Sequence, residues 1–339
     1  MRLIKTEDAV GHVLCHDMTQ IIKDQYKDAR FRKGHVVTEE DIPVLLSMGK
    51  EHLYVWEMTS GMVHENDAAE RLLALCGQEN MIRSGVKEGK IELKAACDGV
   101  FLVDSARLVA VNSQDEVMIA TRKGGMAVRE GDKLAGMRVI PLIIEEEKLR
   151  KAEQAAGDKP LLSLKPYVRK TACIVATGGE VKKGLIKDTF TPVVIDKLKT
   201  YGIETLEVVY SGDGVENVRD AVLTMREKKP DMILCTGGMS VDPDDNTPGG
   251  IKAAGANIIA YGAPVLPGAM FLLGYFDDGM PVMGLPGCVM YAGATVFDLV
   301  LPKIAADVPV TRADLAALGE VGLCLWCKPC HYPICPFGK

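Results

Sequence analysis

The pattern of apolar and polar positions changes near residue 158. Upstream, short apolar runs punctuated by Gly, Asp and Asn predict strands at 91–93, 100–103, 108–111, 117–121 and 139–144. Charged amphipathic runs predict helices at 39–48, 64–77 and 145–156. The first part of the chain is therefore predicted to contain a small α+β module (1–60) and a mostly β module (61–157).

Downstream, strand and helix patterns alternate. Apolar runs predict strands at 172–176, 204–209 and 232–235, and amphipathic runs predict helices at 193–201 and 215–227. This alternation predicts an α/β domain over residues 166–308, with a mainly parallel sheet between two helix layers. In such sheets the ligand lies at the carboxyl ends of the strands. Residues 309–339 form a cysteine-rich tail.

Composition and charge exclude several classes of function. A chain of 339 residues with 47% hydrophobic and 25% charged residues is typical of a globular protein with more than one core. Its net charge of −6 argues against a nucleic-acid partner. The most apolar stretch, 264–276, is broken by Pro267 and Gly268, and the N-terminus lacks the apolar run of a signal peptide. We expect a cytoplasmic protein without a membrane partner.

Two of the predicted strands end in glycine turns of the same design. The turns are Thr177-Gly178-Gly179-Glu180 and Thr236-Gly237-Gly238-Met239-Ser240. Glycine after a strand allows positive φ, so that successive backbone N–H groups can point at one oxyanion. Either turn alone is also compatible with an ordinary tight turn.

Aspartates follow the same strands. Asp188 precedes the predicted helix at 193–201, Asp213 follows the strand at 204–209, and the second glycine turn leads into Asp242-Pro-Asp244-Asp245. Carboxylates that converge beside a bound phosphate require a cation such as Mg²⁺ between them. The alternative for each aspartate singly is a helix cap or a turn residue.

Several common chemistries are disfavoured in this domain. Residues 171–323 contain no histidine, which argues against Ser-His and Cys-His catalysis. The sequence contains neither a Walker loop nor a GxGxxG run. An ordinary P-loop ATPase or Rossmann dehydrogenase is therefore not expected.

The motif series as a whole resembles the molybdopterin-binding domain shared by molybdopterin molybdenumtransferases and molybdopterin adenylyltransferases. The resemblance covers about 140 residues and depends on the order of the motifs. The motifs are the two glycine turns, Asp188-Thr189, Asp213, Asp245, Pro267-Gly268 and Gly284-Leu285-Pro286-Gly287.

This resemblance implies a role for each motif. The turn at 236–240 would bind the phosphate and pterin of molybdopterin, with Ser240 at its end. Asp213 and Asp245 would be the essential acids tied to Mg²⁺ and nucleotide chemistry. The turn at 177–180 and Asp188 would line the same pocket, and the two Pro-Gly pairs would close over the substrate. The implied reaction inserts molybdate into adenylylated molybdopterin, in a homodimer.

The sequence also departs from the transferase pattern. Ala269 stands where a lysine usually follows the first Pro-Gly pair, and Cys288-Val289 stands for Asn-Pro after the second. The N-terminal Ser-Met-Asp-Gly-Tyr signature is absent, and Asp67 is a candidate substitute. The chain therefore resembles a short, divergent branch, and two alternatives stay open: a molybdopterin adenylyltransferase, or a carrier or sensor that delivers finished cofactor to a molybdoenzyme.

Four of the ten cysteines lie close together in the tail. Cys324, Cys327, Cys330 and Cys335 have spacers of two, two and four residues, and Pro336 follows the last. This spacing predicts a tetrathiolate site for zinc or an iron–sulfur cluster, with His331 as a substitute ligand. The alternative is a thiol-rich tail without metal.

Overall fold

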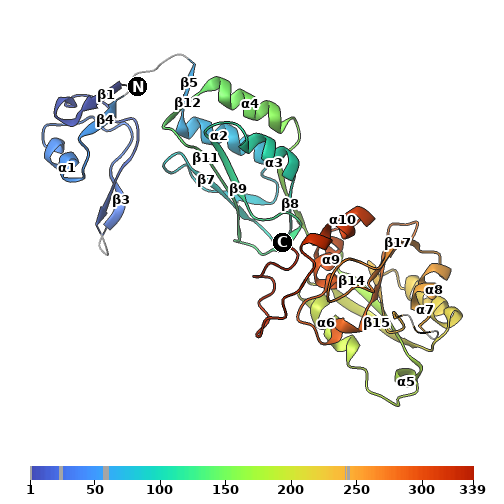
Figure 1. Cartoon of the computed structure of the whole chain (residues 1–339). Helices are drawn as coiled ribbons and strands as arrows, with labels where there is room; N and C mark the ends of the chain where they lie inside the picture. Colours follow the sequence, from blue (N-terminus) through green and yellow to red (C-terminus); the bar gives the residue numbers. More distant parts are fainter. Residues whose placement is uncertain (1, 23–25, 56–60, 241, 243–244) are drawn as a thin grey trace. The chain divides into compact units, whose positions relative to one another are not determined.

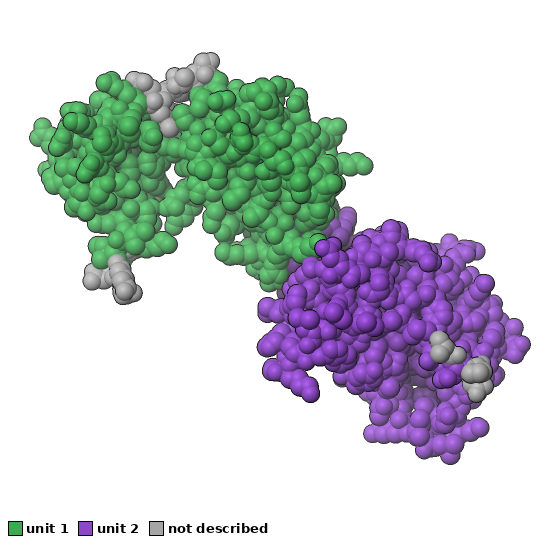
Figure 2. Space-filling model, viewed as in Figure 1, with its two compact units in different colours: residues 1–96, 103–124, 131–163 green, residues 97–102, 125–130, 164–339 purple. Residues whose placement is uncertain are grey.

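The computed structural model describes residues 2–22, 26–55, 61–240, 242 and 245–339. The chain divides into two compact units (Figure 2). The first consists of residues 1–96, 103–124 and 131–163, and the second of residues 97–102, 125–130 and 164–339. The ranges predicted from the sequence stay predictions, because a division by compactness does not test which segments fold on their own.

The first unit begins with a small module of strands around one helix. Its elements are β1 Arg2–Lys5, the 3-10 turn η1 Thr6–Asp8, β2 Met18–Ile22, β3 Tyr26–Phe31, α1 Asp41–Ser47 and β4 His52–Val55. β1 pairs antiparallel with β4, and β2 pairs antiparallel with β3. Buried apolar side chains, among them Leu14, Leu45 and Leu53, form the core of this module.

The rest of the first unit combines an antiparallel sheet with three helices (Figure 1). Its elements are β5 Met62–His64, α2 Glu65–Cys76, β6 Met81–Arg83, β7 Ile91–Ala95, α3 Ser105–Asn112, β9 Val117–Thr121, β11 Lys133–Val139, β12 Ile143–Glu145 and α4 Glu146–Ala156. The sheet has the order β6-β7-β11-β9, and β12 pairs with β5. This region is therefore α+β, with more helix than the strand-like runs predicted.

One predicted strand is wrong. Residues 108–111 lie in helix α3, where the Asp104 side chain accepts a hydrogen bond from the Arg107 N–H at 3.1 Å and caps the helix. A run of four apolar residues fits a buried strand and a buried helix turn equally well. The run predicted at 139–144 is divided, since β11 ends at Val139 and β12 begins at Ile143.

The second unit is built on a six-stranded mixed sheet. Its strands are β14 Thr171–Thr177, β15 Glu204–Ser211, β16 Met232–Thr236, β17 Asn257–Tyr261, β18 Leu272–Tyr275 and β19 Pro281–Leu285, in the order β15-β14-β16-β19-β18-β17. β15, β14, β16 and β19 are parallel neighbours, whereas β18 runs antiparallel to both β19 and β17. A smaller sheet, β10-β8-β13, contains β8 Gly99–Val103, β10 Met126–Val128 and β13 Leu162–Pro166.

Helices cover both faces of the large sheet, which confirms the predicted three-layer α/β/α architecture. Side chains alternate along β14: Ala172 and Ile174 join the core with α6 Phe190–Lys199 and α9 Val296–Ala305. Cys173 and Val175 join the core with α7 Val215–Glu227 and α8 Thr247–Ala253. The remaining elements are α5 Gly179–Lys182, η2 Gly287–Met290, α10 Arg312–Ala316 and η3 Ala317–Glu320.

No helix in the described part of the chain is both long enough and apolar enough to cross a bilayer.

Candidate functional site

The loops that carry the predicted site residues lie along one edge of the large sheet. Thr177 pairs with Ser211, and Thr236 pairs with Ala176 and Leu285, so the four parallel strands end level with one another. β18 runs the opposite way and begins beside the end of β19. The turns after β14, β15, β16 and β19 and the loop before β18 therefore share the carboxyl edge, where ligands bind in such sheets.

The two glycine turns pack directly against each other. Gly237 and Gly238 adopt φ of +79° and +56°, which disfavours any residue with a side chain. A Cβ on Gly237 would collide with the backbone oxygen and hydroxyl of Thr177. A Cβ on Gly238 would lie 2.7 Å from Thr247 Oγ1. Glycine at these two positions is therefore required by close backbone approach as well as by φ.

Buried threonine hydroxyls hold this junction together. Thr177 Oγ1 donates to the Thr236 carbonyl at 2.8 Å, and Thr247 Oγ1 donates to the Gly237 carbonyl at 2.8 Å. The two hydroxyls lie 3.1 Å apart. Thr247 is fully buried, and the sequence analysis did not single it out as a site residue. Its place before Pro248, at the start of a helix, is the one local signal that could have indicated it.

Asp213 is bound to the first glycine turn. Its Oδ2 accepts a hydrogen bond from the Gly179 N–H at 2.9 Å, although its side chain is exposed at the edge of the sheet. The Gly179 amide, which was predicted to point at a ligand, is thus directed at a carboxylate. A second oxygen of Asp213 can still serve a cation.

Lys182 is a cation at this edge that the sequence analysis missed. A Cβ on Gly212 would lie 3.9 Å from Lys182 Nζ, so the ammonium group is close to the loop that carries Asp213. Lys182 belongs to the short α5 segment after the first glycine turn, and its sequence signal is the pair Lys182-Lys183. Exposed lysine suits an anionic ligand as a flexible point charge.

Asp245 closes the second glycine turn. Its Oδ2 accepts from the Ser240 N–H at 2.9 Å, and the Tyr261 hydroxyl donates to the Met239 carbonyl at 3.0 Å. Burial and the nearby charge of Asp245 raise the pKa of the Tyr261 hydroxyl, which therefore stays a donor. Asp244, which the sequence analysis also named, lies outside the described residues.

Asp188 acts as a helix cap, as the alternative interpretation predicted. Its Oδ1 accepts from the N–H groups of Phe190 and Thr191 at 2.8 and 3.0 Å, at the start of α6. Burial alone would raise the pKa of this carboxyl, but hydrogen bonds from Thr191, Phe190 and Tyr210 outweigh burial and lower it.

The two Pro-Gly pairs lie at the same edge. Gly268 has φ of +126°, and a Cβ there would lie 2.6 Å from Val296 Cγ1, so the first pair rests on the beginning of α9. The Pro267 carbonyl accepts from the Val296 N–H at 3.3 Å. In the second pair, Pro286 is buried and Gly287 begins η2. Glu180, at the end of the first glycine turn, is exposed.

The structure does not gather the predicted metal ligands around one point. Among the residues that it describes, no three His, Cys, Asp or Glu side chains are close enough together to hold a metal ion. Asp213 and Asp245, which were predicted to bind magnesium, each accept a hydrogen bond from a backbone amide of their own or a neighbouring turn. The roles of these two acids and of the tail cysteines therefore stay predictions.

Comparison with known proteins assigns the domain. Residues 173–306 match a family described as a probable molybdopterin binding domain, and residues 3–57 match a domain of unknown function, DUF8806. A CinA-like protein of Mycobacterium tuberculosis is 33% identical over 76 residues, which are 22% of this chain and 18% of that protein. A CinA-like protein of Petrotoga mobilis is 32% identical over 76 residues, 22% of this chain and 19% of that protein.

Solved structures also resemble part of the chain. The molybdopterin biosynthesis Mog protein from Mycobacterium ulcerans is 20% identical, with a TM-score of 0.35, over 41% of this chain and 99% of that one. The protein CinA from Thermoplasma acidophilum is 18% identical, with a TM-score of 0.35, over 40% and 98%. The resemblance that the motif order predicted is confirmed by the family match, which covers residues 173–306 and therefore less than half of the chain.

Proposed function

We propose that the carboxyl edge of the large sheet binds molybdopterin and that the protein acts in molybdenum cofactor biosynthesis. The observation that carries this proposal is the meeting of the turns at 177–180 and 236–240 with both Pro-Gly pairs at one sheet edge. These loops belong to a domain that matches the molybdopterin-binding family.

The anionic phosphate of molybdopterin accounts for the residue types at this edge. Close packing of Gly237 and Gly238 against Thr177 and Thr247 fixes the backbone of this turn at the carboxyl edge. Lys182 supplies positive charge beside the first turn. Asp213 and Asp245, each with a second carboxylate oxygen, would hold Mg²⁺, which would neutralise phosphate charge. Oxygen donors of this kind fit magnesium chemically.

The leading activity is transfer of molybdate into adenylylated molybdopterin, with release of the nucleotide in a magnesium-dependent step. In this role Asp213 and Asp245 position the cation, and Asp188 caps α6 beside the pocket. The protein would be a cytoplasmic homodimer. These points rest on the resemblance and on the placement of the acids.

A carrier function is the second candidate, because Ala269 replaces the usual lysine and Cys288-Val289 replaces Asn-Pro. A carrier would bind finished cofactor and deliver it to a molybdoenzyme apoprotein. Adenylyl transfer from ATP to molybdopterin is the third candidate function.

One set of assays on the purified full chain distinguishes these candidates. Adenylylated molybdopterin, molybdate and Mg²⁺ are supplied anaerobically, and released nucleotide and active cofactor are measured. Nucleotide release with cofactor formation supports the transferase. Product formation from molybdopterin and ATP indicates the adenylyltransferase, and tight cofactor binding without turnover indicates the carrier. If the protein binds neither molybdopterin, its adenylylated form nor the finished cofactor, the proposal is wrong.

A further inference from the structure

The cysteine-rich tail is packed onto the second unit. Phe337 is 2% exposed and belongs to the same core as α6 and α9. The Tyr332 hydroxyl donates to the Asp298 carbonyl of α9 at 3.0 Å, and the Gly338 N–H donates to the Val321 carbonyl at 2.9 Å. The tail therefore has fixed points on both sides of its cysteines.

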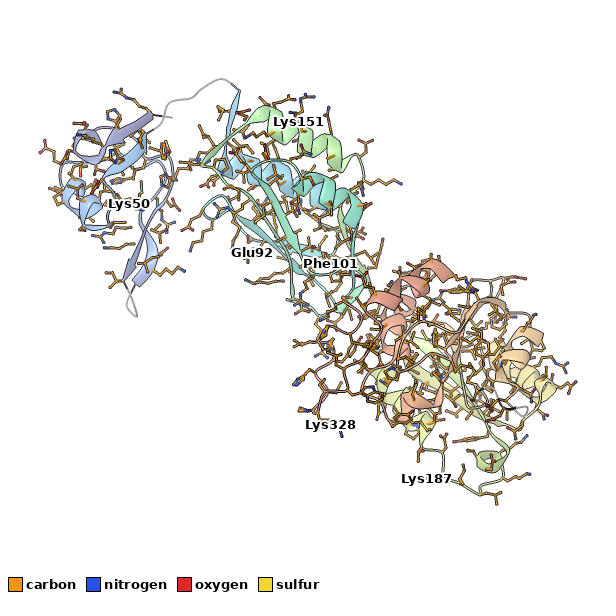
Figure 3. The ribbon with its side chains drawn as sticks, viewed as in Figure 1. Lys50, Glu92, Phe101, Lys151, Lys187 and Lys328 are labelled. Carbon is orange, nitrogen blue, oxygen red and sulfur yellow. The ribbon has the colours of Figure 1, made fainter. Side chains whose placement is uncertain are left out.

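All four tail cysteines and His331 line one hollow of about 230 Å³. The rest of its lining is mainly apolar, formed by Ala294, Leu325, Tyr332, Ile334, Pro336 and Phe337. A hollow of this size is far larger than the roughly 10–15 Å³ that one water molecule occupies. Lys328, between two of the cysteines, is exposed on the outside of the tail (Figure 3), so among the described residues no ammonium group lines the hollow.

The hollow adjoins the loops of the proposed molybdopterin site. A Cβ on Gly293 would lie 2.7 Å from Cys330 Sγ, so this glycine allows the thiol to approach the segment that follows η2. At the other end, the Leu266 N–H donates to Gly322 and the Cys324 N–H donates to Leu266, each at 2.8 Å. Leu266 directly precedes the first Pro-Gly pair, so the tail contacts the surroundings of both pairs.

We propose that the four tail thiolates bind an iron–sulfur cluster in this hollow. The spacers of two, two and four residues followed by proline resemble those of bacterial ferredoxins, whose last spacer is one residue shorter. A single zinc ion needs its four sulfurs within about 4 Å of one another, since a Zn–S bond is about 2.3 Å long. No three metal-binding side chains of the described residues, the tail cysteines included, lie close enough together for one ion. A cluster instead binds one thiolate at each iron, so that thiols spread over the wall of a hollow can hold it, although Cys327 and Cys330 are exposed.

Metal analysis of the anaerobically purified full chain tests this inference, which does not depend on molybdopterin binding. After incubation with sulfide and equal amounts of ferrous and ferric iron, we expect about four iron and four sulfide per chain, with broad absorption near 400 nm. Four thiols should then be protected from iodoacetamide and become reactive after cluster removal. A parallel incubation with zinc chloride tests whether the tail binds zinc instead.

Cysteine-to-serine variants identify the thiols that bind the cluster. Cys327→Ser and Cys330→Ser should lose most of the iron, whereas Cys97→Ser, which changes a partly exposed cysteine outside the tail, should retain it. The thiol-protection measurement on the unmodified chain does not depend on the folding of any variant. Stoichiometric zinc without iron would overturn the cluster in favour of a zinc site, and binding of neither metal would overturn a metal site altogether.

Discussion

Asp245 combines two properties that substitution can separate. Its carboxylate accepts from the Ser240 N–H and carries the negative charge proposed to hold Mg²⁺. Asp245→Asn retains an oxygen for the amide and loses the charge. We expect turnover to be abolished and magnesium affinity to fall at least about tenfold.

Stability of the Asp245→Asn variant should change by less than about 0.5 kcal/mol, because the substitution is at the surface and keeps the turn. Urea unfolding provides this control, and Asp242→Asn in the same turn is the matched variant. Unchanged activity and magnesium dependence in Asp245→Asn would remove the proposed role of this acid.

We predict that the contribution of Asp188 to the free energy of unfolding depends on pH. Since hydrogen bonds lower its pKa in the folded state, the ionised carboxylate stabilises the fold above the pKa of unfolded aspartate. This stabilisation is lost as the pH falls through the lowered folded pKa. Asp188→Asn should therefore be less stable than the unmodified protein at pH 7, and the difference should disappear in strong acid. Urea midpoints measured from pH 7 to pH 2 test this, and a difference that does not change with pH would contradict it.

Gly237 is expected to tolerate no side chain. Gly237→Ala combines an unfavourable φ with a collision against the Thr177 carbonyl. Gly255 also has a positive φ, of +90°, but no described atom lies within 4 Å of the position that a Cβ would occupy there. Gly255→Ala should cost roughly 1 kcal/mol, from backbone conformation alone.

Gly237→Ala should cost clearly more than this control and weaken molybdopterin binding at least about tenfold, since 1.4 kcal/mol corresponds to a factor of ten. Thermal unfolding and ligand titration measure the two effects. Equal losses of stability in the two variants would mean that the turns are not held in close contact.

Between elements, the buried hydroxyl of Thr247 links α8 to the turns after β14 and β16. Thr247→Val keeps the shape and leaves the Gly237 carbonyl without its donor, which should cost about 1–3 kcal/mol. The matched control is Thr224→Val, because that exposed hydroxyl bonds within its own helix and should matter by less than about 0.5 kcal/mol. Equal unfolding free energies for the two variants would contradict the linking role.

The elements of the α/β domain were largely predictable from the sequence. The apolar runs at 172–176 and 232–235 are long enough and regular enough to mark β14 and β16, and α7 begins and ends where the pattern predicts. α6 is displaced, because Asp188 caps it and starts it at Phe190 rather than at 193. The strand predicted at 108–111 failed because a short apolar run has no distinctive period.

The placement of the candidate site residues at one sheet edge was predictable, but their contacts were not. The order of strands and turns was enough to place the glycine turns at one edge, because parallel strands bring their carboxyl ends together. That Gly179 binds Asp213, and that Thr247 reaches the Gly237 carbonyl, depends on side-chain packing between residues far apart in sequence. Sequence periodicity carries no information about such pairs.

At the scale of the whole molecule, residues 173–306 match the molybdopterin-binding family and residues 3–57 match a domain of unknown function. The tail, with its anchoring residues Tyr332 and Phe337, packs on the α/β core. The thiol-lined hollow and the proposed ligand site therefore belong to the same compact unit.

The division of the chain into units also constrains how this protein can be rearranged. Residues 97–102 and 125–130 belong to the second unit, although the segments on either side of each belong to the first. They supply β8 and β10, which form a sheet with β13, and the Gly99 carbonyl accepts from the Tyr167 hydroxyl at 3.0 Å. A gene cut at residue 164 would leave the downstream product with an unpaired strand edge. We therefore expect a product that begins at residue 164 to be less stable than one that also supplies β8 and β10.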